Sequence, residues 1–208
     1  MIFFDLDGTL IDSNNVWLQI DLDFLAQRHL PYTKAYSDYV SHATYQDAAA
    51  YTKSCFGLSE SVDEIVQIWS DMAYEAYANT IPLKPFVWDF LTLQQAKGEP
   101  MGIVTSCMDH LCHAVLKRTG IDRFFSSITT VRESKKGKQD PDLFLLAARK
   151  TGMPPPSCMV FEDSPVACES ARKTGMQVIG VYDPFFAEYE QEMQRICHQY
   201  IHSFQELL

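Results

Sequence analysis

Four short segments of the chain carry side chains that could do nucleophilic, acid–base or metal chemistry. In the first, Asp5 and Asp7 lie two residues apart within Phe-Asp-Leu-Asp-Gly-Thr. Side chains of an extended strand alternate between its two faces, so residues two apart project in the same direction. Because Asp-Gly is also common in turns, this segment alone fits a turn and a catalytic pair about equally well.

The three later segments are weaker signals when each is taken alone. Thr105 and Ser106 follow an apolar run and precede a helical pattern, a place where hydroxyl and amide groups bind an anion or simply cap the helix. Lys138 lies in a polar loop and alone resembles an ordinary exposed lysine. Glu162 and Asp163 are adjacent acids after another apolar run, where they can cap the next helix or bind Mg²⁺.

The elements that must position these residues follow from hydrophobic periodicity. Short apolar runs predict buried strands at 1–5, 100–105, 157–163 and 176–182. Helical patterns lie at 86–97, 107–119, 141–151 and 165–174. This alternation predicts an α/β fold with a parallel sheet covered on both faces. The stretch after 184 predicts a helix and then a short strand or coil.

The placement of the four segments is more informative than any one of them. Each falls at the edge of the predicted sheet where the strands have their carboxyl ends. Open parallel sheets bind their ligands in a crevice at that edge. The coincidence therefore favours one site built from all four segments.

The stretch 14–81 interrupts the alternation of strands and helices. It is rich in Ala, Gln, Tyr and acidic residues at helical spacing and lacks convincing strand patterns. Pro82 and Pro85 stiffen the return to the sheet. We predict a core domain formed by 1–13 and 82–208, and an α-helical cap domain formed by 14–81.

The four segments match, in order, the motifs of the haloacid dehalogenase superfamily. The form Phe-Asp-x-Asp-Gly-Thr is the most specific of them, and the helical insertion resembles the type 1 cap of subfamily I. The chain is thus similar to β-phosphoglucomutase and to phosphatases like phosphoglycolate phosphatase. The resemblance implies a Rossmann-like parallel sheet with an inserted helical cap.

The resemblance also implies a Mg²⁺-dependent phosphatase that works through an aspartyl phosphate. Asp5 would be the nucleophile, and Asp7 would be the acid and then the base. Thr105, Ser106 and Lys138 would bind the phosphate together with Asp5. The implied metal ligands are the carboxylates of Asp5, Glu162 and Asp163 and the backbone carbonyl of Asp7.

The implied substrate is a small phosphorylated metabolite such as a sugar phosphate. In the cap, Trp17, His42 and Tyr45 are predicted to face it. A mutase like β-phosphoglucomutase is the first alternative, but its Gly-x-Ser-Arg cap segment corresponds here to His-Ala-Thr-Tyr, and Trp17 replaces its histidine. A binding module without catalysis is the second alternative. Asp7 argues against a dehalogenase or phosphonatase, since both lack that aspartate.

Composition limits the partners that the chain would accept. The 208 residues carry a net charge of −10, which opposes binding to nucleic acid or an anionic membrane. The apolar runs are shorter than the roughly 20 residues of a membrane helix. We expect a cytoplasmic protein, because Asp5 comes too early for a secretory signal. We expect a monomer or a small homo-oligomer. The six cysteines are expected to be free thiols.

Overall fold

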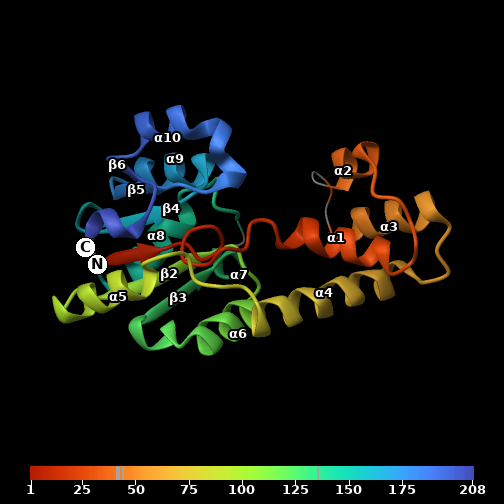
Figure 1. Ribbon diagram of the computed structural model, residues 1–208. Coiled ribbons are helices and arrows are strands. Elements are labelled where there is room, and N and C mark those ends of the chain that lie inside the picture. The colour runs from red at the N-terminus through yellow and green to blue at the C-terminus, as the bar shows by residue number, and fades with distance from the viewer. Residues whose placement is uncertain (41–42, 44, 135) are drawn as a thin grey trace. The chain divides into compact units, whose positions relative to one another are not determined.

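A six-stranded parallel sheet with the strand order β3-β2-β1-β4-β5-β6 dominates the computed structural model, which describes residues 1–40, 43, 45–134 and 136–208 (Figure 1). The strands are β1 (Ile2–Phe4), β2 (Met101–Thr105), β3 (Ser127–Thr130), β4 (Met159–Glu162), β5 (Gln177–Val181) and β6 (Gln199–Ile201). Every neighbouring pair is parallel. The predicted α/β fold with a Rossmann-like sheet is confirmed.

Helices connect the strands along the chain. They are α5 (Val87–Ala96), α6 (Asp109–Thr119), α7 (Val131–Ser134), α8 (Asp142–Thr151), α9 (Pro165–Lys173) and α10 (Glu190–Ile196). Short 3₁₀ segments in the described residues are η1 (Ile121–Phe124), η2 (Pro155–Ser157), η3 (Pro184–Tyr189) and η4 (Phe204–Leu207). The one strand that the sequence patterns do not predict is β3, which lies at the sheet edge and reads Ser-Ile-Thr-Thr.

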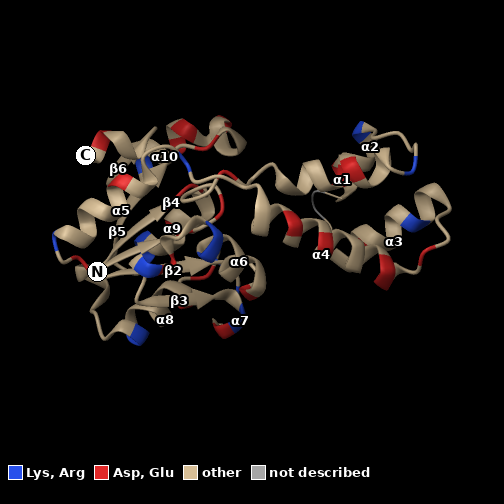
Figure 2. Cartoon of the chain, turned by 60° about the horizontal axis from the view of Figure 1, so that its bottom comes forward, with Lys and Arg blue, Asp and Glu red and all other residues tan. Residues whose placement is uncertain are grey.

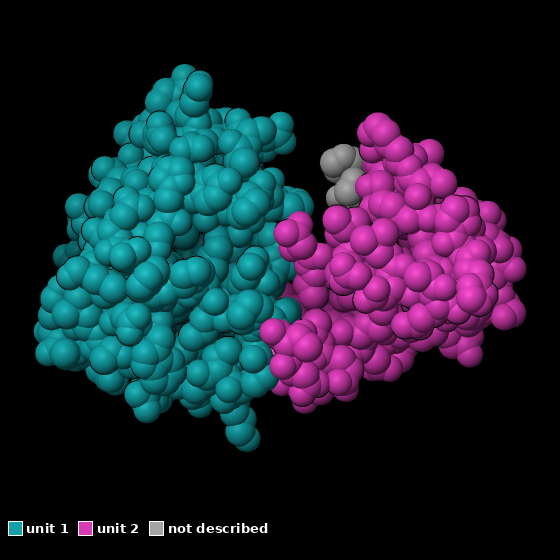
Figure 3. All heavy atoms as spheres, viewed as in Figure 1, with its two compact units in different colours: residues 1–14, 81–208 teal, residues 15–80 magenta. Residues whose placement is uncertain are grey.

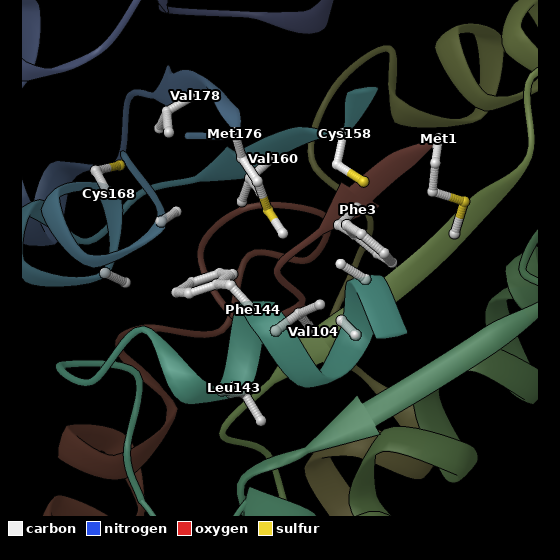
Figure 4. Packing of buried hydrophobic residues seen from close by; sticks show 14 of the residues in the cluster. Met1, Phe3, Val104, Leu143, Phe144, Cys158, Val160, Cys168, Met176 and Val178 are labelled. Carbon is white, nitrogen blue, oxygen red and sulfur yellow. The ribbon is translucent and has the colours of Figure 1, made fainter. Parts of the chain in front are cut away.

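One face of the sheet is covered by α8 and α9. Phe3 of β1 and Val160 of β4 point to this side, where they join a buried cluster with Phe144 of α8 (Figure 4). All three side chains are fully buried. Because strand side chains alternate, the next residue of each strand must face the other way.

Aromatic side chains cover the opposite face of the sheet. Phe4 stacks on Phe161 with ring centroids 4.9 Å apart. Phe90 of α5 and Phe204 of η4 pack against Phe161 at 5.3 and 5.6 Å. Burial on both faces explains why these strands are continuously apolar and why their ends, not their middles, carry the polar residues.

The chain divides into two compact units, one formed by 1–14 with 81–208 and the other by 15–80 (Figure 3). The second unit is helical, with α1 (Val16–Ala26), α2 (Lys34–Val40), α3 (Tyr45–Phe56) and α4 (Val62–Asn79). A capping box between Ser61 and Glu64 starts α4. Acidic residues outnumber basic ones in this unit (Figure 2).

The helical unit has its own aromatic core. Phe24 of α1 meets Trp69 of α4 with ring centroids 5.6 Å apart, and both side chains are buried. In the described part of the chain, none of the helices is at once long and apolar enough to cross a membrane.

Candidate active site

Strand register brings the first and last acidic segments together. Phe4 of β1 pairs with Phe161 of β4, and the N–H of Asp5 donates to the Phe161 carbonyl at 2.9 Å. Asp5 therefore lies beside Glu162 at the carboxyl ends of two central strands. The strand order reverses between β1 and β4, and parallel sheets bind ligands at such a reversal.

Three carboxylates converge at this point. Each of Asp5, Glu162 and Asp163 offers one oxygen, and these oxygens lie within 4.8 Å of one another. All three residues are buried, with 5, 1 and 3% of their surface exposed. The Lys138 ammonium reaches them from the loop before α8, forming ion pairs with Asp5 and, at 2.7 Å, with Glu162.

The cluster carries more negative charge than Lys138 can balance. Burial, followed by the charge of Glu162, raises the pKa of Asp5 to about 8, although Lys138 opposes the rise. The same two causes raise the pKa of Asp163 well above its ordinary value. Burial disfavours the charged form of Lys138, but its two carboxylate partners outweigh burial and raise its pKa.

Asp163 is oriented by the loop that follows β1. Thr9 Oγ1 donates to its Oδ1 at 3.2 Å, and Asn14 Nδ2 donates to its Oδ2 at 2.7 Å. Gly8 makes this approach possible, because its φ is +79° and a Cβ there would overlap both Asn14 and Asp163. The Asp-Gly pair of the first segment thus shapes the site as well as the turn.

Asp7 lies in the same loop but outside the group of three carboxylates. Its Oδ1 accepts a hydrogen bond from Ser13 Oγ at 2.7 Å. The predicted metal contact of Asp7 uses its backbone carbonyl, and that contact stays a prediction. A half-buried carboxyl held by a hydroxyl beside the cluster suits proton transfer to a bound ligand.

A pocket of about 310 Å³ opens over the cluster. Its lining includes Asp5, Asp7, Asn14, Ser106, Lys138, Glu162 and Asp163. Ser106 is exposed, whereas the preceding Thr105 is fully buried at the end of β2. The Thr105 hydroxyl accepts a hydrogen bond from the Cys107 N–H at 2.9 Å, so that amide is already bonded.

The residues predicted to face a substrate lie in the helical unit. Trp17 and Tyr45 are both half-buried and meet edge to face, with ring centroids 5.5 Å apart. Tyr45 also contacts Trp69 at 5.7 Å, so aromatic packing within the unit already involves both residues. His42 lies outside the described residues. The substrate role of these three residues stays a prediction.

A buried ion pair beneath the first loop has no sequence signal. Lys84 Nζ donates to the Asp183 carboxylate and to the Tyr182 carbonyl, each at 2.8 Å, and to the Gly8 carbonyl. The side chains are 12 and 2% exposed. Lys84 thereby joins the loop after β1 to the end of β5, although 99 residues separate it from Asp183.

The donor set fits a divalent cation. Three carboxylates supply hard oxygen ligands of the kind that Mg²⁺ and Ca²⁺ prefer. Within the described residues Lys138 is the cation paired with the cluster, and its one charge leaves an excess of buried negative charge when the three are ionised. A divalent cation would neutralise that excess. The raised pKa values of Asp5 and Asp163 are consistent with a cluster that needs further positive charge.

Known proteins resemble the chain in sequence and in fold. Residues 2–181 match the family model described as haloacid dehalogenase-like hydrolase. A probable pseudouridine-5'-phosphatase of Drosophila melanogaster is 30% identical, over 87% of this chain and 80% of its own. A phosphorylated carbohydrates phosphatase of Thermotoga maritima is 20% identical, over 86% and 82%.

Among solved structures, a putative β-phosphoglucomutase of Thermotoga maritima superposes with a TM-score of 0.85. The alignment covers 96% of this chain and 93% of the other, at 18% identity. At that identity the likeness establishes the fold and leaves the reaction open.

The Lys84 ion pair generates a stability prediction. Lys84→Met leaves the Asp183 carboxylate buried without its cation, so we expect the free energy of unfolding to fall by about 3–5 kcal/mol. Adding Asp183→Asn removes the orphaned charge and should recover part of the loss. Urea denaturation of the two single variants and the double variant measures this.

Lys173→Met is the matched control, since Lys173 and its partner Glu169 are both 59% exposed. Its effect should stay within about 0.5 kcal/mol. Equal losses for Lys84→Met and Lys173→Met would show that burial does not matter for the Lys84 pair.

Proposed function

The chain belongs to the haloacid dehalogenase-like hydrolase family, and from that membership we propose that it hydrolyses a small phosphomonoester with Mg²⁺, through an aspartyl phosphate on Asp5. It is a phosphoric monoester hydrolase. The observation that carries the finer proposal is the convergence of Asp5, Glu162 and Asp163 around Lys138 in one pocket.

The metal would be held by Asp5, Glu162 and Asp163, with the Asp7 carbonyl as a further ligand. When bound, Mg²⁺ supplies positive charge that offsets the repulsion between a carboxylate and a phosphate dianion. Lys138 adds a fixed cation next to Asp5 and would hold phosphoryl oxygens. Ser106 and Thr105 would donate hydroxyl hydrogens to the same oxygens.

The first half-reaction transfers the phosphoryl group to Asp5. A carboxylate oxygen of Asp5 forms a bond to phosphorus while the bond from phosphorus to the leaving oxygen breaks. Asp7 gives its proton to that leaving oxygen, and the alcohol departs. Ser13 holds the Asp7 carboxyl in place for this transfer.

The second half-reaction returns Asp5 to its starting state. Asp7, now a carboxylate, takes a proton from water, whose oxygen bonds to phosphorus as the bond to Asp5 breaks. Inorganic phosphate leaves, and Asp7 is again protonated. The same residue thus serves as acid and base in turn.

We propose a sugar phosphate as the substrate class. The phosphatases similar to this chain include one named for phosphorylated carbohydrates and one named for pseudouridine 5'-phosphate. The 310 Å³ pocket suits a phosphate group with part of a small molecule. Trp17 and Tyr45 of the helical unit are proposed to select the remainder of the substrate.

Replacement of the nucleophile tests the reaction. Phosphate release from a panel of sugar phosphates and nucleotides should depend on Mg²⁺. Asp5→Asn should lower the rate by about 10³-fold or more, because the amide cannot form the acyl phosphate. Asp12 is an exposed aspartate in the same loop. The control variant Asp12→Asn should therefore keep the wild-type rate of phosphate release.

Two results of that panel would count against the proposal. Phosphate release that Asp5→Asn leaves intact would exclude Asp5 as the nucleophile. Interconversion of β-glucose 1-phosphate and glucose 6-phosphate with little free phosphate would identify a mutase instead.

Metal binding can be tested without activity. A saturating Mg²⁺ concentration of about 100 times Kd adds about 2.7 kcal/mol to stability, which for a chain of this size raises Tm by about 5–10 °C. Asp163→Asn should lose most of this shift and Asp12→Asn should keep it, in thermal melts at constant ionic strength. A wild-type Tm that Mg²⁺ leaves unchanged would refute the metal site.

A further inference from the structure

Two cysteines lie side by side where α9 meets the end of α10. Cys168 belongs to α9 and is fully buried, whereas Cys197 directly follows α10 and is partly exposed. The two side chains interact with each other. Both join the buried cluster on the α8–α9 face of the sheet, where Figure 4 labels Cys168.

Arg172 fixes the two segments to each other. It lies one helical turn after Cys168, and its Nη1 donates to the carbonyl of Ile196 at 2.8 Å and to that of Arg195 at 3.4 Å. These carbonyls end α10, where a basic side chain can satisfy them. Cys197 is the next residue, so these bonds hold its backbone against α9.

Gly180 of β5 leaves the space that the Cys197 sulfur occupies. A Cβ at position 180 would lie 2.8 Å from Cys197 Sγ and 2.6 Å from Tyr200 Cδ2, both closer than real Cβ atoms approach. The backbone N–H of Gly180 also hydrogen-bonds the sulfur. The sulfur of Cys197 is therefore positioned by the strand as well as by Cys168.

The two thiols differ in reactivity. The interaction with the Cys168 side chain is the main reason that the pKa of Cys197 is lowered, and the charge of Arg172 acts in the same direction. A partly exposed thiol beside a buried thiol is the arrangement in which the first is oxidised and the second resolves it.

We propose that Cys168 and Cys197 form a modification site at which a hydroperoxide oxidises the two thiols to an intramolecular disulfide. The Cys197 sulfur attacks the terminal oxygen of the hydroperoxide, and the O–O bond breaks. The alcohol, or water if the oxidant is hydrogen peroxide, leaves with the thiol proton. Cys197 becomes a sulfenic acid.

The buried partner completes the reaction. The Cys168 sulfur attacks the Cys197 sulfur, an S–S bond forms and the S–O bond breaks. The hydroxyl group leaves with the Cys168 proton as water. The two sulfurs together lose two electrons, which the hydroperoxide gains.

The disulfide would form next to the acidic cluster. Cys168 Sγ lies 3.5 Å from the Glu162 carbonyl oxygen, to which its S–H can donate. Helix α9 begins at Pro165, two residues after Asp163. Oxidation would remove the thiol donor from the backbone of an acidic-cluster residue.

Peptide mapping of the folded chain tests the proposal, with Cys55→Ser as the background because Cys55 is the exposed thiol. After hydrogen peroxide treatment and alkylation, mass spectrometry should find the Cys168 and Cys197 peptides cross-linked, with a loss of about 2 Da. Dithiothreitol should restore both thiols. Neither readout depends on phosphatase activity.

Two variants separate the roles of the cysteines. Cys168→Ser keeps a hydrogen-bond donor toward Glu162 but cannot resolve, so dimedone should trap a sulfenic acid on Cys197. Cys197→Ser should slow oxidation of Cys168 by about tenfold or more, because Cys168 is fully buried and has lost its partner.

Two outcomes would overturn the proposal. One is a disulfide that joins any other pair of cysteines in the folded chain. The other is full recovery of Cys168 and Cys197 as free thiols after a peroxide exposure that oxidises free glutathione completely. The map of the Cys55→Ser chain decides between these results even if Cys168→Ser or Cys197→Ser fails to fold.

Discussion

Three buried carboxylates lie around Lys138 at the carboxyl edge of the sheet, and this imbalance of charge constrains the rest of the site. The parallel register of β1 and β4 forces Asp5 and Glu162 to be neighbours, so the repulsion between them is built into the fold. Lys138 offsets part of it. Burial and the remaining repulsion raise the pKa values of Asp5 and Asp163, and the excess negative charge suits a divalent cation.

The surrounding residues keep these charges in place. Thr9 and Asn14 hold both oxygens of Asp163, and the positive φ of Gly8 lets the loop approach them closely. Lys84 anchors the same loop from below through the Gly8 carbonyl. A cluster that repels itself can persist in a folded protein only where the backbone is tied down in this way.

The sequence predicted the strands whose side chains are buried on both faces of the sheet. The strands around Phe3 and Val160 are short apolar runs. When such runs alternate with helical patterns, few structures other than buried parallel strands fit them. The edge strand β3 was missed because Ser127 and Thr129 carry no apolar signal. The first loop and the acids at the end of β4 could be singled out because motif spacing and strand ends coincide.

Contacts between residues far apart in the chain could not be predicted. Nothing in the sequence marks Lys84 as the partner of Asp183, or Asn14 as the partner of Asp163, because neither pair belongs to a repeating pattern. For the aromatic residues of the helical unit, the sequence likewise predicts the element but not the contacts. Their spacing indicates a helix, while the structure adds that Trp17, Tyr45 and Trp69 pack on one another. What Trp17 and Tyr45 contact in a substrate remains a proposal.

Detection of the aspartyl phosphate on Asp5 tests the central claim most directly. The wild-type protein would be mixed with the sugar phosphate that it hydrolyses fastest, quenched in acid within milliseconds, and digested for mass spectrometry. The account predicts that the peptide containing Asp5 gains about 80 Da, and that hydroxylamine, which cleaves acyl phosphates, removes the addition. Steady release of phosphate with no such adduct, or with the phosphate on another residue, would contradict it.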